Sequence, residues 1–293
     1  MVRASINYLD RAVQAPYQYL CEPPAGEAID NFRDDVVPLD VEDISGVPLP
    51  EQHARGWTTE QAGFQIVQGF GAPQTQAAWA EGRWDDDEWL RKQYYDDVTE
   101  LLRKELGITS TFIFDHTVRK SGTEHLPDTP QNRKPVPRAH CDQSRRAGET
   151  RIRKHLGDDV LARVQRGELH CQLVNVWRPL RGPVEEFPLA VADSRSVDRG
   201  EDGGKPDWIA SELRYETWSG ETLLIHHNPK HQWYYYKGID TDKSIFLKTY
   251  DSKTETRTPH TAFVDPTSRP DAQPRWSVEV RVLCFTETQP AAQ

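Results

Sequence analysis

The sequence contains little cysteine, no long apolar run and no long basic block. Its four cysteines, Cys21, Cys141, Cys171 and Cys284, include no Cys-x-x-Cys pair. Neither a zinc ribbon nor a dense disulfide framework is therefore expected. Reduced, partly buried thiols are the simplest interpretation, as in a cytosolic protein.

The scarcity of apolar runs and of basic blocks also limits the kinds of partner that the protein is expected to bind. No stretch approaches the roughly 18 consecutive apolar residues that cross a bilayer as a helix. Polar and charged residues interrupt the first 20 positions, so no signal peptide is expected. The formal net charge is −10, which argues against nucleic acid or an anionic membrane as the main partner. We therefore expect a cytoplasmic protein that binds neither.

Aromatic residues, in contrast, are plentiful. Nine tryptophans and ten tyrosines are enough to build a core and still line a pocket. Asp85–Asp87 begin a predicted helix, because acidic side chains favour the positive first turn of a helix. An apolar face follows, and Gly107 ends the helix. That face consists of Leu90, Tyr94, Val98, Leu101 and Leu102, and we expect it to pack on the back of a sheet.

Most of the remaining pattern is that of short strands. The predicted strands are residues 36–41, 63–68, 111–118, 171–177, 189–192, 221–226, 232–236, 245–250 and 277–285, with one further helix at 148–166. Such a series favours a mainly β fold with flanking helices, namely a double-stranded β-helix or cupin-like jelly roll. A doubly wound sheet would alternate strands and helices more regularly. We expect one domain over 1–293, with a jelly-roll core at 111–287 and residues 1–80 wrapped on it as an arm.

One short motif within the predicted core points to chemistry. His140 and Asp142 are two positions apart, so on a strand both side chains point to the same face and can reach one metal ion. Together with a distant histidine they would form a two-histidine, one-carboxylate facial triad. This arrangement leaves coordination positions open and is typical of non-haem Fe(II) oxygenases. The motif alone is weak evidence, because it occurs by chance in many chains.

A second histidine-containing segment spans Gly220–Trp233. In it a Gly-acid turn enters an apolar strand, and His231 comes eleven residues after the glycine. A similar run delivers the third iron ligand in oxygenases like the phytanoyl-CoA hydroxylases. By this resemblance His231 is expected to complete the triad, with His226 and His227 as competing candidates.

Further segments extend the pattern over the second half of the chain. They are Phe114–Arg119, His140–Ser144, Asn175–Leu180, Asp193–Ser196, Asn228–Tyr235, Tyr250–Ser252, Pro259–Phe263 and Ser277–Arg281. As a set they resemble the fungal hydroxylase/desaturase family of the aspergillic-acid pathway type. This family also includes a gibberellin desaturase and a meroterpenoid endoperoxidase, and it is related to the phytanoyl-CoA hydroxylase group. The resemblance covers about residues 80–287.

The resemblance implies an Fe(II)- and 2-oxoglutarate-dependent dioxygenase that uses O₂ to oxidise a C–H bond of a small natural product. Hydroxylation, desaturation and endoperoxidation are all compatible with it. The expected substrate is a mid-sized, largely apolar secondary metabolite such as a terpenoid, a polyketide or a peptide-derived alkaloid. A homodimer is a further expectation, because long arms often exchange contacts between subunits.

The distal carboxylate of 2-oxoglutarate requires a cation. Lys248, Arg257 and Arg281 are the candidates, of which an arginine would bind the carboxylate with two hydrogen bonds and the lysine as a point charge. Arg281 alternates with Glu279, so an ordinary ion pair on an edge strand is an equal reading. Gln143 is expected next to the iron ligands.

Two histidines and the function itself have alternative interpretations. His116 and His260 are each interpreted either as structural histidines or as pocket residues. A metal enzyme of the same fold that uses no keto acid is an alternative function, because no arginine lies about a dozen residues after His231. A non-catalytic partner subunit is a second alternative, against which the intact His-x-Asp motif counts.

Overall fold

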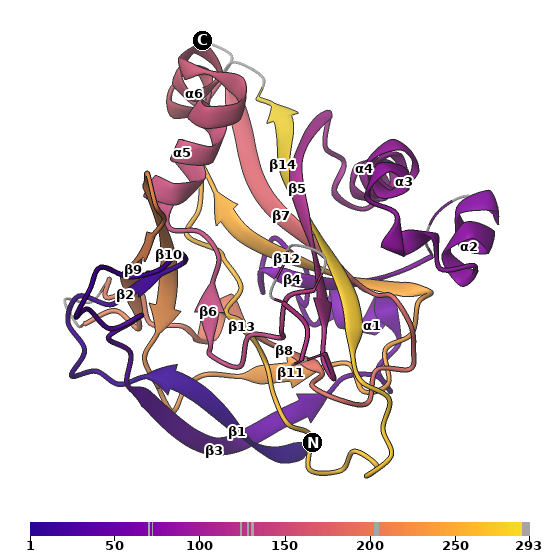
Figure 1. The fold of residues 1–293 in the computed structure, drawn as a ribbon. Helices are drawn as coiled ribbons and strands as arrows, with labels where there is room; N and C mark the ends of the chain where they lie inside the picture. The colour runs from indigo at the N-terminus through magenta and orange to yellow at the C-terminus, as the bar shows by residue number, and fades with distance from the viewer. Residues whose placement is uncertain are drawn as a thin grey trace.

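Two curved β-sheets form the double-stranded β-helix that the sequence predicts (Figure 1). This computed structural model describes residues 1–69, 71, 73–123, 125–127, 129, 132–201 and 205–288. The smaller sheet has the order β4 (Phe64–Gln68), β12 (Lys243–Asp251), β7 (Leu169–Pro179), β14 (Trp276–Glu287) and β5 (Ser110–Lys120). The larger sheet has the order β1 (Val2–Leu9), β3 (Asp34–Asp43), β11 (Trp233–Tyr235), β8 (Leu189–Ala192), β13 (His260–Ala262), β6 (His140–Cys141), β10 (Ser219–Ile225), β9 (Trp208–Arg214) and β2 (Tyr17–Tyr19).

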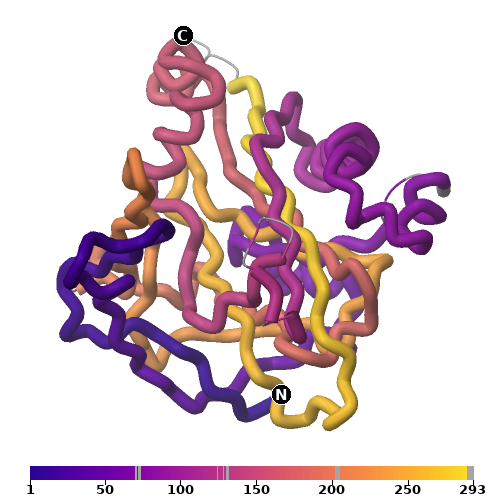
Figure 2. Tube along the Cα trace, in the orientation of Figure 1, coloured from indigo at the N-terminus to yellow at the C-terminus, as the bar shows by residue number. Residues whose placement is uncertain are grey.

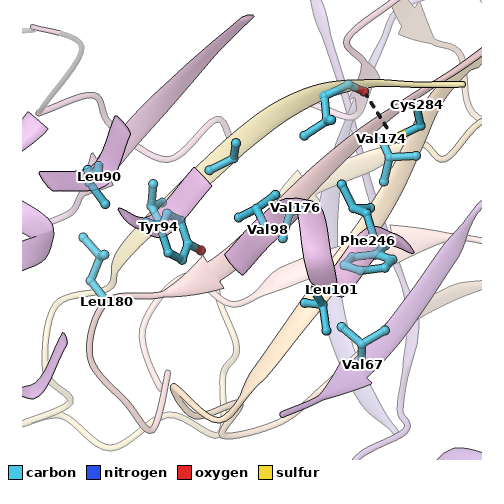
Figure 3. Close-up of a cluster of buried hydrophobic side chains, with 14 of the residues drawn as sticks. Val67, Leu90, Tyr94, Val98, Leu101, Val174, Val176, Leu180, Phe246 and Cys284 are labelled. Carbon is cyan, nitrogen blue, oxygen red and sulfur yellow. Dashed lines mark hydrogen bonds between the residues drawn. The ribbon is translucent and has the colours of Figure 1, made fainter. Parts of the chain in front are cut away.

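A helical segment covers the outer face of the smaller sheet, as predicted. It comprises the short turns Arg83–Asp85, α3 (Asp87–Trp89) and Leu90–Tyr94, followed by α4 (Tyr95–Leu106), and Gly107 ends it with a φ of 63°. Figure 3 shows Tyr94, Val98 and Leu101 beside Val176 and Phe246 of the sheet. Full burial of such a valine or leucine contributes roughly 1.5–3 kcal/mol, so this contact holds the helix against the barrel.

The predicted helix at 148–166 is two helices, α5 (Arg145–Leu156) and α6 (Asp158–Gln165). Gly157 separates them with a φ of 89° and an extended ψ of 172°, a conformation that favours glycine. Ser144 caps the start of α5 by accepting a hydrogen bond from the backbone N–H of Ala147. The remaining helices are α1 (Leu49–Ala54), α2 (Pro73–Ala80) and the single turn Ser194–Ser196. Among the residues described, no helix has the length and apolarity needed to cross a bilayer.

The first 80 residues contribute strands to both sheets. β1 and β3 form an antiparallel pair that joins the larger sheet through β11, whereas β4 joins the smaller sheet through β12. In β1 the buried residues alternate with more exposed ones, as in a half-buried strand. Figure 2 shows this indigo segment on the opposite side of the molecule from the purple helices α2 to α4. The region expected as an arm is thus hydrogen-bonded into the sheets.

One strand that the sequence reasoning did not predict matters for function. β13 has only three residues and lies between β8 and β6 in the larger sheet. Its first residue, His260, pairs with His140 of β6 and with Val191 of β8. Three residues are too few for an alternating pattern to be read, so this histidine was interpreted without a strand to orient it.

Candidate metal centre and cavities

Three side chains converge where β6 and β13 lie side by side. The ligand atoms of His140, Asp142 and His260 are all within 4.8 Å of one another. The Nε2 atoms of the two histidines lie 3.3 Å and 3.8 Å from Oδ1 of Asp142. Cys141, between the two motif residues, points elsewhere, and its thiol contacts the carbonyl of Thr249 at 3.5 Å. The strand geometry expected for the His-x-Asp motif is therefore present.

The backbone orients both imidazole rings of this cluster. Nδ1 of His140 donates to the carbonyl of Arg138 at 2.8 Å, and Nδ1 of His260 donates to the carbonyl of Thr258 at 3.2 Å. A proton on Nδ1 leaves the lone pair of each Nε2 free for a metal. Burial, followed by the nearby charge of His140, lowers the pKa of His260 to about 3. The ring of His260 is thus neutral, as a ligand must be.

Asp142 presents one oxygen to the histidines and uses the other for hydrogen bonds. Its Oδ2 accepts from Nδ2 of Asn175 at 2.7 Å and from Nε of Arg281 at 3.4 Å. Burial by itself would raise the pKa of Asp142, but the nearby imidazole of His140 and the charge of Arg281 outweigh burial and hold the pKa well below its usual range. The result is an oriented carboxylate.

This donor set fits a ferrous ion. Two imidazole nitrogens and one carboxylate oxygen form the two-histidine, one-carboxylate arrangement, which leaves positions open for further ligands. The neighbouring thiol of Cys141 is turned away, and burial raises its pKa to about 12. The site therefore lacks the soft thiolate ligand that Cu⁺ would favour.

His231, which was expected as the third ligand, is not part of this cluster, and His260 lies in its place. Nε2 of His231 lies 3.1 Å from Oδ2 of Asp207, and Nδ1 lies 3.2 Å from the hydroxyl of Tyr8. Both ring nitrogens are therefore already hydrogen-bonded. The loop that carries His231 leads into β11, and β8 and β13 separate β11 from β6 in the sheet. Hence a strand later in the chain, β13, brings its histidine to His140.

The two competing histidines of the same loop also lie outside the cluster. Nδ1 of His226 is 2.8 Å from the carbonyl of Leu9, and His227 packs edge-on against the ring of Tyr8. Both contact the N-terminal strand β1. The histidine-rich loop therefore fastens the first residues of the chain to the barrel.

The predicted cosubstrate anchors are engaged with other groups. Lys248 is fully buried and pairs with Oδ2 of Asp251 at 2.8 Å. Arg257 forms an ion pair with Glu255 and lies 3.5 Å from the carbonyl of Gln143. Lys248 and Arg257 are thus paired with carboxylates of their own segments.

Arg281 and Gln143 lie closer to the cluster. Besides Asp142, the guanidinium of Arg281 contacts Oε1 of Glu279 at 2.7 Å and Oδ1 of Asp115 at 3.2 Å. Gln143 is 4% exposed, and its Oε1 is buried without a hydrogen-bond partner. Arg281 therefore orients the carboxylate ligand, whereas Gln143 offers a free acceptor beside it.

Two arginines that the sequence reasoning did not consider lie next to the ligands. Arg119 and Arg275 line a narrow inner cavity that also includes His140, His260 and Trp177. Nη1 of Arg275 donates to the carbonyl of Phe187 at 2.5 Å, while its Nε is buried without a partner. Burial, followed by the charge of Arg119, lowers the pKa of Arg275 to about 9.

An arginine was expected about a dozen residues after the last histidine ligand, and Arg275 has a similar spacing from His260 rather than from His231. Arg275 lies fifteen residues after His260 and directly before β14. With His231 as the reference, the search for an arginine about a dozen residues further along found none.

A larger outer cavity of about 480 Å³ shares His140 and Arg119 with the inner one and also includes Asp142. The N-terminal segment, β5, the residues before β6, α5 and the β9–β10 hairpin supply its walls. His116 belongs to this lining and is also hydrogen-bonded to the hydroxyl of Tyr95 at 2.8 Å. Its lining is Gln18, Leu20, Phe32, Arg91, Asp115, His116, Thr117, Arg119, Arg133, Val136, Arg138, His140, Asp142, Gln143, Arg151, Leu213, Tyr215, Thr222, Leu224 and Arg281.

Comparisons with known proteins show the family and the fold of this chain. A family model described as "YDMC: Oxidoreductase/YMDC permease-like domain" matches residues 6–285. The hydroxylase/desaturase poxK of Penicillium oxalicum is 28% identical over 90% of this chain and 84% of its own length. The Fe(II)/2-oxoglutarate-dependent dioxygenase nvfI of Aspergillus novofumigatus is 30% identical over 69% of this chain and 70% of its own. A solved structure of the iron and alpha-ketoglutarate-dependent endoperoxidase NvfI has the same fold, with a TM-score of 0.81 and 23% identity over 98% of both chains.

Proposed function

This chain belongs to the oxidoreductase family that includes the fungal hydroxylase/desaturases and Fe(II)/2-oxoglutarate-dependent dioxygenases, and we propose that it oxidises a C–H bond of a small natural product. The observation that carries the proposal is the convergence of His140, Asp142 and His260, whose ligand atoms lie within 4.8 Å of one another. We assign these three side chains as the ligands of Fe(II). Bound iron supplies the activation of O₂ that is coupled to decarboxylation of 2-oxoglutarate.

The protein contributes positioning and electrostatics. Asn175 and Arg281 hold Oδ2 of Asp142, which keeps its Oδ1 directed at the histidines. Arg275 is the proposed anchor for the distal carboxylate of 2-oxoglutarate, because its Nε is buried and free and it shares the inner cavity with both histidine ligands. Arg119 adds a second positive charge there. Two converging guanidiniums suit a carboxylate better than the point charge of a lysine.

The proposed substrate side is the outer cavity. His140 and Asp142 line it, so a substrate bound there would place a C–H bond near the metal. The relatives' names include hydroxylases, desaturases and an endoperoxidase, and each outcome belongs to the proposal for this chain. A cytoplasmic location and a homodimer stay predictions from the sequence.

An anaerobic titration tests this function. Fe(II) is added to the purified chain, followed by 2-oxoglutarate, and the visible absorption spectrum is recorded. A weak metal-to-ligand charge-transfer band is expected, because a ferrous site with three protein ligands has room to chelate the keto acid. Failure to bind iron would overturn the proposal. Binding of iron without the band would contradict the role of 2-oxoglutarate and favour a metal enzyme that uses no keto acid.

A further inference from the structure

The outer cavity is positively charged within an acidic protein. Six arginines but only two aspartates line it, whereas the whole chain has a formal net charge of −10. A concave site with low-dielectric walls concentrates such a local charge and attracts ligands of the opposite sign. The cavity therefore suits a more acidic ligand than the largely apolar natural product that was expected from the sequence.

Three of these arginines are already neutralised. Arg281 pairs with both cavity aspartates, since it lies 3.2 Å from Asp115 and 3.4 Å from Asp142. Arg91 and Arg138 form ion pairs of 2.8 Å and 2.7 Å with aspartates outside the cavity. Both acidic side chains of the lining are thus paired with Arg281, and neither forms an ion pair with another arginine of the lining.

The other three arginines have no carboxylate partner within the part of the chain that the structure describes. Nη1 of Arg119 donates to the carbonyl of Lys134 at 2.8 Å, and Glu279 and Asp142 act on its charge without forming an ion pair with it. Arg151 lies over the ring of Phe114 at 5.4 Å, and Arg133 lines the cavity without an ion pair to a described residue. Partly buried cations without a partner are costly, and a bound anion offsets that cost.

Arg133 and Arg151 act on the same end of the cavity. One precedes β6 and the other belongs to α5, yet both line the cavity together with Tyr215. The charges of both, with that of Arg281, lower the pKa of the Tyr215 phenol, against the larger raising effect of burial and the charge of Asp115. Tyr215 is stacked on Trp218 with the ring planes 7° apart, which fixes its position. The apolar part of the wall consists of Leu20, Phe32, Leu213, Val136 and Leu224. Two guanidiniums and a phenol at one end of an apolar wall suit an amphiphilic acid.

This cationic end is distinct from the proposed cosubstrate anchor. Arg275 lines the inner cavity and Arg133 and Arg151 line the outer one, while Arg119 borders both. A single 2-oxoglutarate held by Arg275 and the metal therefore leaves Arg133 and Arg151 unoccupied. A second organic anion is needed to pair with them.

We propose that the substrate of this enzyme is an organic acid whose carboxylate pairs with Arg133 and Arg151 while its apolar body rests on the wall around Phe32 and Leu213. This inference rests on the proposed function, because it assumes that the outer cavity is the substrate side of the iron site. The carboxylate holds one end of the molecule and so presents a C–H bond at a set distance from the metal ligands.

The test uses a matched pair of probes of nearly the same size and shape, the anionic naphthalene-1-acetate and the neutral naphthalene-1-acetamide. Each is titrated calorimetrically into the enzyme loaded anaerobically with Fe(II) and 2-oxoglutarate. The acetate is expected to bind at least about tenfold more tightly than the amide, as charge-assisted hydrogen bonds to arginine allow. Arg151→Gln and Arg133→Gln are each expected to abolish most of that preference. Arg146→Gln removes an exposed arginine of the same helix that does not line the cavity, and it should keep the preference.

The outcomes distinguish this proposal from binding at the cosubstrate anchor and from failure of the proposed function. Equal affinity for the two probes, binding of neither, or an unchanged preference in both cavity variants would overturn it. Loss of acetate binding in Arg275→Gln, together with competition by excess 2-oxoglutarate, would place the acetate on the cosubstrate anchor and also overturn it. The charge-transfer band, recorded in the same samples, reports on the proposed function independently. Absence of the band would defeat the iron–keto acid assignment, whereas the acid preference is still measured by titrating the iron-free chain.

Discussion

The histidine–aspartate pair at His140 and the pair at His231 use the same residue types for different purposes. At His140, Nδ1 is bonded to a backbone carbonyl, and Nε2 faces a carboxylate oxygen that the neighbouring His260 also faces. At His231 both nitrogens are bonded, one to Asp207 and one to Tyr8. The two pairs therefore differ in their free lone pairs. At His140 free lone pairs point towards one another, whereas at His231 both ring nitrogens are already hydrogen-bonded.

The two aspartates differ in the same way. Oδ2 of Asp142 takes the hydrogen bonds from Asn175 and Arg281, and Oδ1 is left to the histidines. Asp207 uses both oxygens, because Oδ1 accepts from Arg11 at 2.7 Å and Oδ2 accepts from the backbone N–H of Asp198 at 2.8 Å. A carboxylate and an imidazole whose polar atoms all have hydrogen-bond partners stabilise a loop. A carboxylate with one oxygen left over is available to a metal.

Removing one histidine from each site tests most directly whether the two sites have different roles. His260→Ala is expected to lower iron binding and turnover by more than about 100-fold, since loss of an outer hydrogen-bond partner alone costs about 10–100-fold. His231→Ala should keep the iron and the charge-transfer band but lower the free energy of unfolding by about 1–3 kcal/mol, because Asp207 loses a buried donor. Iron titration and urea denaturation of both variants measure this. Loss of iron in His231→Ala with retention in His260→Ala would restore the earlier assignment.

The hydrogen bonds to the two carboxylates give a smaller contrast. Asn175→Leu removes the 2.7 Å bond to Asp142 and is expected to weaken Fe(II) affinity by about 10–100-fold. Asn228→Leu is the matched control, because it removes an amide that donates to Asp207 at 3.0 Å. It should leave Fe(II) affinity unchanged and lower only stability. Equal effects of the two variants on iron affinity would show that Asn175 does not orient the ligand.

Much of this molecule could be predicted from local patterns. The helical segment that ends at Gly107, the jelly-roll fold and the shared face of His140 and Asp142 all follow from periodicity within one segment. The third ligand does not, because the adjacency of β13 to β6 is set by the order of strands in the sheet. The run before His231 matched a known ligand loop, but a hairpin, β9–β10, precedes that loop and places it at β11.

The cosubstrate anchor shows the same limit. Lys248 and Arg257 were as plausible in the sequence as Arg275, since all three are basic residues within or near predicted strands. Which cation is free depends on its partners in space: Asp251 takes Lys248 and Glu255 takes Arg257. Sequence patterns identify residue types and the faces on which they lie. Whether a basic side chain already has a carboxylate partner is decided by the fold.

The smallest expected effect is on the acid stability contributed by the structural pair. Burial would raise the pKa of Asp207, but His231, the backbone N–H of Asp198 and Arg11 together lower it to about 2. A depressed pKa stabilises the folded state above the unfolded-state pKa of about 3.9, and this contribution is lost as the pH falls towards the folded-state value. Asp207→Asn should therefore show a shallower decline in the free energy of unfolding between about pH 5 and pH 3 than the wild type. Urea denaturation at each pH, compared as slopes, separates this effect from the constant loss of the ion pair, and identical slopes would mean that Asp207 is not held ionised by its partners.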